Sequence, residues 1–250
     1  TLAERDPGAK KVAITTWEPS AMPEEFAGAL ADFDLVIVPS QFCRASMDYR
    51  ECRRSTDPTG QLYSKVAVVP HCFDPEWWWG GEGIAPRPED QDREYRFYSI
   101  GAWCERKNHL GLLAAYFHAF TRDDPVSLML ISAGADMNAI RSLIARSGVN
   151  PARLPELHVP AEPLTEDQLL ELHLGADCFV SATRAEGFGL PHFEAGFMGR
   201  QVISPLYGGH RDFLRSAPNV AATGYGLTPC FGSEVRGQIV EEDGQLVQKS

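Results

Sequence analysis

The sequence lacks any apolar run long enough to cross a membrane. A membrane-spanning helix needs about 20 predominantly apolar residues, and no stretch of the 250 residues approaches that length. The first eleven residues are polar and charged, which does not fit a signal peptide. Positive charge is also scarce, because 23 Lys and Arg face 34 Asp and Glu, for a net charge of −11. These features predict a cytoplasmic protein and disfavour non-specific binding of nucleic acid or anionic membranes.

The cysteines follow no metal-binding or disulfide pattern. None of the six belongs to a Cys-x-x-Cys pair, and no His/Cys cluster has the spacing of a zinc site. Reduced thiols are therefore expected. One local group of cations stands against the overall acidity: Arg44, Arg50, Arg53, Arg54 and Lys65. A solvated helix face is the favoured interpretation of this group, ahead of a nucleic-acid site.

Short β-branched segments alternate with helical ones along the chain. The predicted strands cover residues 12–16, 35–39, 65–70, 97–101, 127–133, 157–160, 178–182 and 201–205. The predicted helices cover residues 23–31, 42–54, 110–120, 137–147, 166–174, 191–198 and 209–214. This alternation predicts an α/β fold with parallel sheets covered by helices on both faces.

Residues 77–92 interrupt the alternation. They read WWWGGEGIAPRPEDQD, rich in glycine, proline and acid. Such composition is typical of an exposed connection between domains. We therefore predict a linker at 77–96 between a first domain at 1–76 and a second at 97–250. The tail after residue 217 has weak periodicity, and no element is predicted there.

The most informative stretch is SATRAEGFGLPHFEAGFMGRQVISPLYGGHRDFL, residues 181–214. An apolar strand ends at a polar turn, two glycines follow Glu186, and a helix is predicted to open at Pro191. Gly187 and Gly189 let backbone N–H groups approach a ligand closely. A helix N-terminus beyond the carboxyl end of a parallel strand is a common site for anionic ligands.

Two carboxylates flank this turn. Glu186 lies in the loop, and Glu194 lies eight positions later (194 − 186) in the first turns of the helix. Carboxylates placed in this way can accept paired hydrogen bonds from the hydroxyls of a sugar or a ribose. Their placement indicates binding and orientation, and it does not by itself imply acid/base work.

Several segments resemble glycosyltransferase family 4. EGFGLPHFEAGFMGRQVIS resembles its Glu-x₇-Glu signature, followed by YGGHRDFL where the family has a Gly-Gly turn and a helix. SIGAWCERKNHLGLLAAYFHAF and LTEDQLLELHLGADCFVSA resemble earlier parts of the same domain, and WEPSAMPEEFAGALADFDLVIVPSQFC with KVAVVPHCFDPEWW resembles the end of the acceptor domain. The resemblance covers most of residues 12–214 in the family's order. It implies a GT-B-like fold of two facing Rossmann-type domains, the N-terminal one incomplete in this sequence.

The resemblance also implies a retaining transfer from a nucleotide-diphosphate sugar, with no metal and no further cofactor. Lys107, with Arg106 beside it, would neutralise the diphosphate, and Glu186 would contact hydroxyls of the donor sugar. Glu194 would hold the ribose. The rest of the implied donor pocket is backbone: Gly187, Phe188, Gly189 and Leu190 in the loop, with Gly208 and Gly209 in the wall.

Two departures from the family pattern keep other functions open. Ala102 stands where the family usually has a basic residue, and only about half of an acceptor domain precedes Trp77. These departures favour the alternative of a non-catalytic module that binds a nucleotide or glycan. A transferase acting on a modified DNA base is a second alternative, supported only by the arginine group. The acceptor is open among a glycan, a lipid, a protein and such a base, as is the oligomeric state. His71, at a strand end, is open between packing and a place in the cleft.

Overall fold

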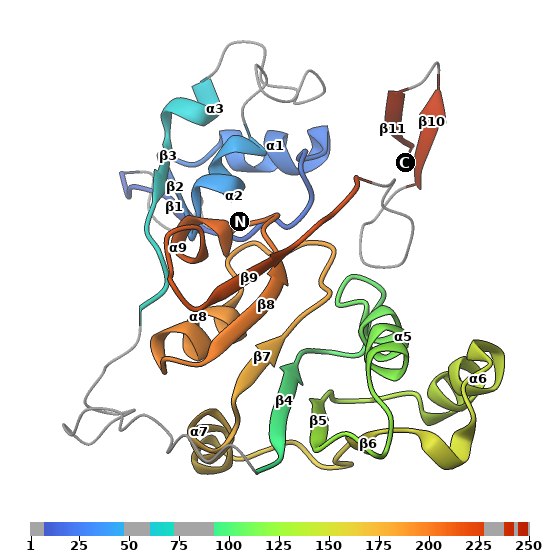
Figure 1. Ribbon diagram of the computed structural model, residues 1–250. Helices are drawn as coiled ribbons and strands as arrows, with labels where there is room; N and C mark the ends of the chain where they lie inside the picture. Colours follow the sequence, from blue (N-terminus) through green and yellow to red (C-terminus); the bar gives the residue numbers. More distant parts are fainter. Residues whose placement is uncertain (1–7, 48–60, 73–92, 228–237, 243–244, 250) are drawn as a thin grey trace.

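The computed structural model describes residues 8–47, 61–72, 93–227, 238–242 and 245–249 (Figure 1). The described chain contains two parallel sheets, of three and six strands, and a separate two-stranded hairpin. The predicted α/β architecture with parallel sheets is therefore confirmed.

The N-terminal half, residues 8–72, is built on the three-stranded sheet in the order β1-β2-β3. Its strands are β1 (Val12–Ile14), β2 (Leu35–Val38) and β3 (Val66–Val68), and its helices are α1 (Glu24–Ala31), α2 (Gln41–Ala45) and α3 (Gln61–Ser64). Both strand pairs are parallel. Val36 and Val38 point into a core with Cys43, Met47 and Leu62, all of them buried. Burial of these apolar side chains holds α2 and α3 against the sheet.

The C-terminal half, residues 93–227, is built on the six-stranded sheet in the order β6-β5-β4-β7-β8-β9. Its strands are β4 (Tyr95–Ile100), β5 (Val126–Ile131), β6 (Glu156–His158), β7 (Cys178–Val180), β8 (Gln201–Pro205) and β9 (Val220–Thr223). Its helices are α5 (His109–Ala119), α6 (Met137–Ser147), the 3₁₀ helix η2 (Pro151–Arg153), α7 (Glu166–Gly175), α8 (Leu190–Phe197) and α9 (Arg211–Leu214). All the strand pairs of this sheet are parallel. Their carboxyl ends therefore share one edge.

The strand order places the two informative loops beside each other. β4 pairs directly with β7, with Phe97 opposite Cys178 and Tyr98 opposite Phe179. The loop after β4 carries the predicted cations, and the loop after β7 carries Glu186. Neighbouring parallel strands end at the same edge of the sheet, so these loops meet although they lie far apart in the sequence.

The elements mostly agree with the predicted ones. The helix at 137–147 and the strand at 201–205 have the predicted bounds. β4 begins at Tyr95, inside the predicted linker, because Tyr95 pairs with Val126 in the sheet. α2 ends at Ala45, within the predicted 42–54, and residues 48–60 lie outside the described chain. The rest of the predicted linker, residues 77–92, lies outside it too.

Three strands were not predicted. They are β9 and the antiparallel hairpin of β10 (Gln238–Glu242) and β11 (Gln245–Lys249). β9 follows a turn and is mostly exposed, with the sequence VAAT. An exposed edge strand of this kind has no apolar run or clear alternation that would reveal it.

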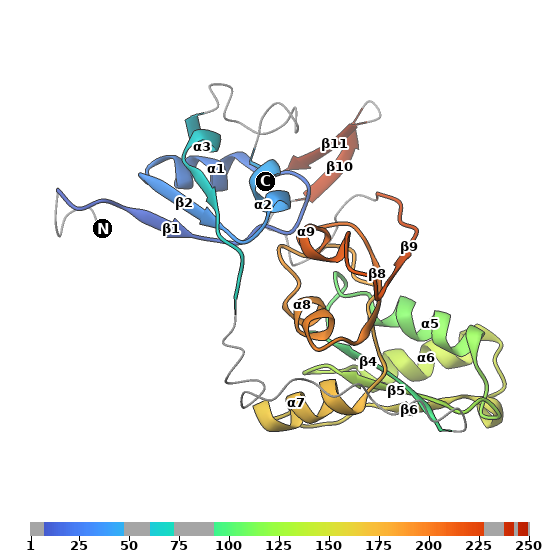
Figure 2. The same ribbon diagram turned by 60° about the vertical axis from the view of Figure 1, so that its left-hand side comes forward.

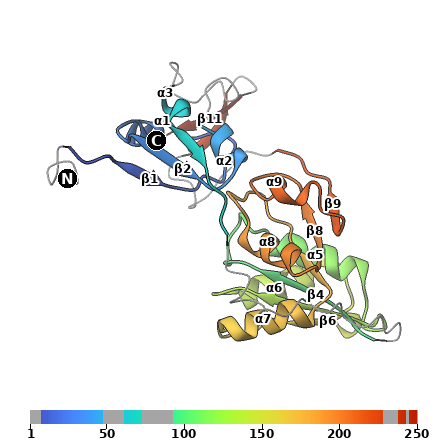
Figure 3. The same ribbon diagram turned by 90° about the vertical axis from the view of Figure 1, so that its left-hand side faces the viewer.

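The two halves contact each other near the loop after β7. Figures 2 and 3 show α2 of the N-terminal half beside α9 of the C-terminal half. The backbone N–H of Gln41 donates to Asp212 Oδ2 at 2.7 Å, and the rings of Phe42 and Tyr207 lie 5.2 Å apart. Across the described chain, no helix combines the length and apolar character needed to span a bilayer.

Candidate functional site

The candidate site is centred on the loop that joins β7 to α8. After β7, residues 181–189 form a loop, and α8 starts at Leu190 with Pro191 in its first turn, one residue before the predicted start. Gly189 precedes the helix with φ of +89°, a backbone conformation that only glycine adopts at little cost. The local sequence therefore dictates both the sharp turn and the start of the helix.

Glu186 is a buried carboxylate with three polar neighbours. Its residue is 4% exposed. Oε1 accepts from Lys107 Nζ at 2.6 Å and from Thr183 Oγ1 at 2.9 Å. Oε2 lies 3.5 Å from Arg106 Nη1. A buried carboxylate keeps its charge only when cations and hydrogen bonds compensate it, and both predicted cations serve that purpose here.

The loop after β4 is tied to the loop after β7 along its backbone. The Arg184 N–H donates to the Arg106 carbonyl at 2.8 Å, and the Asn108 amide donates to the Ala182 carbonyl at 3.1 Å. Asn108 has φ of +54° just before α5. These contacts hold Lys107 at the edge where the strands of the sheet have their carboxyl ends. Its side chain is 13% exposed.

Arg106 also reaches the N-terminal half. Its Nε lies 3.0 Å from Glu18 Oε2, and its Nη1 donates to the Ala185 carbonyl at 2.9 Å. Glu18 was not predicted as a site residue, and no sequence motif marks it. Ala102, in the same loop as Arg106, is exposed.

Glu194 points toward a different neighbour. Its Oε2 lies 3.7 Å from Nε2 of His173, at the end of α7, and its side chain is 17% exposed. The His173 Nδ1 lies 2.7 Å from the Tyr98 hydroxyl. Burial raises the pKa of Tyr98 well above its usual value, so the phenol stays protonated and can donate to His173. His173 and Tyr98 were not predicted, because they lie on other elements and share no motif with Glu194.

The glycines of the site are places of close backbone approach. A Cβ on Gly208, where φ is +111°, would lie 2.7 Å from the Glu186 carbonyl oxygen. A Cβ on Gly209 would lie 1.9 Å from the Gly187 carbonyl oxygen. The Gly208–Gly209 turn therefore packs directly on the Glu186–Gly187 backbone, and side chains there would push the loop away.

Phe188 and His71 meet across the halves. Phe188 is 5% exposed, and its ring packs on Phe193 at 5.5 Å and Phe213 at 5.1 Å. The exposed His71 touches the same ring edge-on at 5.0 Å. Leu190 is 47% exposed. The Phe188 side chain thus anchors the loop against α8, α9 and His71.

Two buried histidines lie beneath the loop. The rings of His192 and His210 stack at 4.4 Å with an interplanar angle of 16°. His192 Nε2 lies 3.0 Å from Ser204 Oγ, and His210 Nε2 lies 2.5 Å from the Pro205 carbonyl. A carbonyl only accepts, so His210 carries its proton on Nε2. Burial lowers the pKa of both histidines, which keeps the stacked rings neutral.

This burial predicts a loss of stability in acid. An unfolded histidine has a pKa of about 6.5, whereas His192 and His210 have lowered pKa values when folded. The unfolded chain therefore binds more protons below that value, and the free energy of unfolding should fall as the pH drops through about 6.5. The slope is at most about 1.4 kcal/mol per pH unit for each histidine. Urea unfolding of the parent between pH 7.5 and 5.5 should show this fall.

A variant pair isolates the histidine contribution. His192→Gln should reduce the difference in unfolding free energy between pH 7.5 and 5.5. His118→Gln, at an exposed position on α5, should leave that difference as in the parent. Equal pH dependence in the parent and both variants would show that His192 does not contribute.

The remaining cations and acids of interest lie elsewhere. Arg44 lies over the Tyr63 ring at 4.5 Å, and Lys65 Nζ donates to the Ala31 carbonyl at 3.0 Å. A solvated helix face was expected, but Arg44, in α2, and Lys65, in the turn after α3, are both half-buried. The other three arginines of that group lie outside the described residues. No group of three or more His, Cys, Asp or Glu suited to a metal occurs among the residues that the structure describes.

Two Asp-x-Asp triplets are present in the sequence. In the first triplet, at residues 32–34, the Asp34 carboxylate accepts hydrogen bonds from Lys10 Nζ at 3.2 Å and from the Lys11 N–H at 2.9 Å. These contacts lower the pKa of Asp34, chiefly through the Lys11 hydrogen bond. The second triplet, at residues 90–92, lies outside the described chain. Asp34 is thus paired with cations and their backbone, as in a surface turn.

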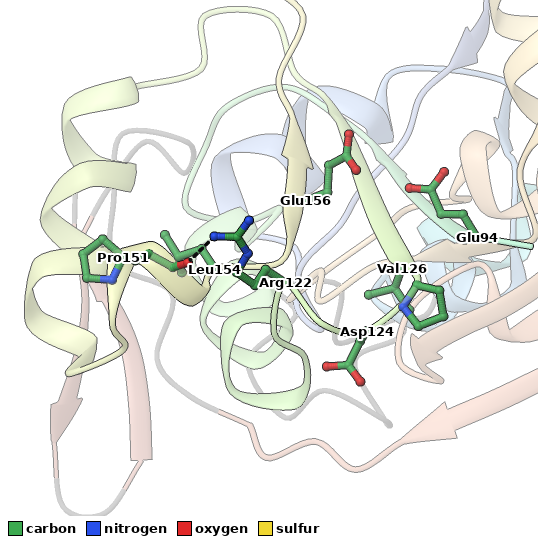
Figure 4. Close-up of a pocket in the computed structure, with 9 residues that line it drawn as sticks. Glu94, Arg122, Asp124, Val126, Pro151, Leu154 and Glu156 are labelled. Carbon is green, nitrogen blue, oxygen red and sulfur yellow. Dashed lines mark hydrogen bonds between the residues drawn. The ribbon is translucent and has the colours of Figure 1, made fainter.

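A hollow of about 680 Å³ lies at the other end of the sheet (Figure 4). Its lining includes Glu94, Val126 and Glu156, which lie at the beginnings of β4, β5 and β6, together with Arg122 and Asp124. Ligands of parallel α/β sheets bind at the carboxyl ends of the strands. Glu186 and its partners Lys107, Thr183 and Arg106 lie at that end of the sheet. We therefore place the candidate site there and not at the hollow.

Comparison with known proteins shows the fold. No protein-family model matches the sequence, and no curated protein matches it. Solved structures do match. A variant of S. aureus TarM in complex with Fondaparinux, alpha-GlcNAc-glycerol and UDP has a TM-score of 0.59 and 14% identity, over 86% of this chain and 40% of that one. The pneumococcal O-GlcNAc transferase GtfA, in complex with UDP and GlcNAc, has a TM-score of 0.55 and 16% identity, over 84% of this chain and 40% of that one.

A third match is WaaG, a glycosyltransferase involved in lipopolysaccharide biosynthesis. It has a TM-score of 0.55 and 11% identity, over 88% of this chain and 66% of that one. This chain thus spans 40% of TarM and GtfA and 66% of WaaG. At these identities the likeness is one of fold: parallel α/β sheets, as in glycosyltransferases of the GT-B type.

Proposed function

We propose that this chain binds a nucleotide-diphosphate sugar at the edge formed by the loops after β4 and β7, and transfers the sugar with retention and without a metal. The observation that carries the proposal is the buried pair of Lys107 and Glu186, 2.6 Å apart, beside the glycine loop before α8. A cation, a carboxylate and a helix N-terminus together suit a ligand with both phosphate and hydroxyl groups.

Each part of the donor has a matching group. Glu194, inside α8, would hold the ribose, and Glu186, in the loop, would accept hydrogen bonds from sugar hydroxyls. The backbone at Phe188, Gly189 and Leu190 would face the sugar and diphosphate. The two glutamates lie on opposite sides of the helix start, which suits an extended ligand that crosses it.

The chemistry of the transfer would depend on charge stabilisation. The diphosphate gains negative charge as the bond to the sugar breaks, and Lys107 with Arg106 and the N–H groups at the start of α8 would stabilise it. Lys107 has three donors, so it can contact a phosphate while it stays near Glu186. Arg106 would have to share its guanidinium between Glu18 and the phosphate.

Two observations favour the alternative of a non-catalytic binding module. Ala102 supplies no cation next to the end of β4, and Arg106 already pairs with Glu18 at 3.0 Å. With one cation fewer, the site would stabilise a departing diphosphate less well and would still hold the donor. Turnover is the property that separates the two functions.

The test is the release of nucleoside diphosphate from UDP-, GDP- and ADP-sugars by the purified chain, in water alone and with glycan, lipid, protein or modified-base acceptors added to receive the sugar, each with and without EDTA. A transferase of the proposed kind should release the diphosphate of one donor class at the same rate in EDTA. Donor binding without any release would support the binding module. Loss of activity in EDTA with recovery in Mn²⁺ would contradict the metal-free mechanism and direct attention to Asp90 and Asp92.

A further inference from the structure

We propose that Ser40, in the N-terminal half, is a positioning residue of the donor site, because it holds the loop that carries Glu186. The inference rests on the proposed function. It assigns part of the donor site to the half of the chain that carries none of the predicted donor-binding residues.

Ser40 makes one hydrogen bond across the junction and one within its own helix. It is fully buried. Its Oγ donates to the Gly187 carbonyl at 2.6 Å and accepts from the Cys43 N–H at 3.1 Å, which caps α2. The single hydroxyl proton is therefore directed at the residue next to Glu186.

The Cys43 thiol supports the same carbonyl. Its Sγ lies 3.2 Å from the Gly187 oxygen and 3.0 Å from the Trp17 oxygen. Burial raises the pKa of Cys43, so the thiol stays protonated and can donate to one of these carbonyls. The N-terminal half thus directs the Ser40 hydroxyl at the Gly187 oxygen, and the Cys43 thiol lies within reach of the same oxygen and of the Trp17 oxygen.

Two consecutive carbonyls of the loop, those of Glu186 and Gly187, each accept a hydrogen bond. The Gly209 N–H donates to the Glu186 carbonyl at 2.7 Å, and Ser40 donates to the Gly187 carbonyl. Asp212, in the helix α9 that follows Gly209, joins this segment to the N-terminal half, because its Oδ2 accepts from the Gln41 N–H at 2.7 Å. A change at Ser40 therefore acts on the backbone that aims the Glu186 carboxylate.

The glycine at 187 fits this contact between the halves. A Cβ there would lie 2.0 Å from Thr16 Cγ2 and 3.2 Å from the Trp17 oxygen. A Cβ on Gly209 would lie 2.8 Å from Ser40 Oγ. The sequence places glycines where the N-terminal half comes closest to the loop.

Glu194 should be independent of this contact. It lies within α8 and faces His173 of α7, and neither element touches Ser40 through a hydrogen bond described for that residue. Loss of the Ser40 hydroxyl should therefore disturb recognition of the sugar, through Glu186, and spare recognition of the nucleotide, through Glu194.

The experiment is calorimetry of the full chain with a nucleotide-sugar and with the matching bare nucleoside diphosphate. The variants are Ser40→Ala and Ser40→Gly, because glycine preserves most of the helix cap. Asp136→Ala is the control, since it removes the cap of α6 and leaves the junction untouched. Both Ser40 variants should bind the nucleotide-sugar about tenfold more weakly and the bare nucleotide as the parent does, and Asp136→Ala should bind both normally.

Two outcomes would overturn the inference, and a third would refute the proposed function on which it rests. Ser40 variants that bind both ligands as the parent does would show that Ser40 does not position the loop. Equal weakening of both ligands would show a general loosening of the junction. A parent that binds neither ligand would instead refute the proposed function. The parent is therefore titrated with both ligands before any variant.

Discussion

Lys107→Ala is expected to weaken binding of a nucleoside diphosphate by about 10- to 100-fold, while the nucleoside binds nearly as before. A charge-assisted hydrogen bond to phosphate is worth about 1.5–3 kcal/mol, and the nucleoside has no phosphate to lose. Lys107 is the closest cation to Glu186, at 2.6 Å. Calorimetric titration of both ligands measures the difference.

The control for this prediction is another lysine. Lys10→Ala removes the same charge from a side chain that is 84% exposed and pairs with Asp34. It should leave both affinities unchanged, which separates a local contact from a change in overall charge. Because Lys107→Ala leaves Glu186 with one cation fewer, thermal unfolding of both variants is measured first. If a folded Lys107→Ala protein loses nucleoside and nucleoside-diphosphate affinity equally, Lys107 lies outside the phosphate site.

The second large effect concerns Glu194. Glu194→Gln keeps the shape of the side chain and removes the charge that strengthens its hydrogen bonds to ribose hydroxyls. Binding should weaken by about 1.5–3 kcal/mol, or one to two decades. The loss should be the same for the bare nucleotide and the nucleotide-sugar, because both carry the ribose.

Glu186→Gln should weaken binding of the nucleotide-sugar only. If Glu186 contacts only the sugar, the bare nucleotide should bind as it does to the parent, while the nucleotide-sugar binds more weakly or turns over more slowly. Gln can still accept from Thr183, which lies 2.9 Å away in the parent. The change leaves Lys107 and Arg106 without their carboxylate partner, so thermal unfolding of Glu186→Gln is measured before its titrations.

The apolar patterns of the sequence predicted most of the fold. Strand β5 is buried or half-buried along its length, with Leu128 and Leu130 fully buried, and strands of this kind appear in a sequence as nearly continuous apolar runs. Helix α6 has its predicted bounds because Asp136 caps its start and Gly148 ends it with φ of +71°. These signals are local, so one sequence suffices to read them.

The contacts of the candidate site depended on three-dimensional arrangement. The glycine motif pointed to Glu186, and the basic loop pointed to Lys107, but their pairing joins residues 79 positions apart and follows from the neighbouring positions of β4 and β7. Glu18 and Ser40 reach the site only because the two halves dock. His173 faces Glu194 from α7, and no spacing rule links the two.

The glycines show how a correct local pattern can have more than one physical cause. Gly187 and Gly189 were expected to let a ligand approach the backbone. Gly189 does start the helix with a left-handed conformation. Gly187 also lies against Thr16 and Trp17 of the N-terminal half, a demand that only the docked halves reveal.

The most direct test of the donor site is a single calorimetric series on the parent, Glu186→Gln and Glu194→Gln, each titrated with a bare nucleoside diphosphate and with the corresponding nucleotide-sugar. We expect that the parent binds both ligands, that Glu194→Gln weakens both by one to two decades, and that Glu186→Gln weakens only the nucleotide-sugar. If both variants bind both ligands as tightly as the parent does, the two carboxylates are helix-end and loop charges, and the loop before α8 is not a donor site.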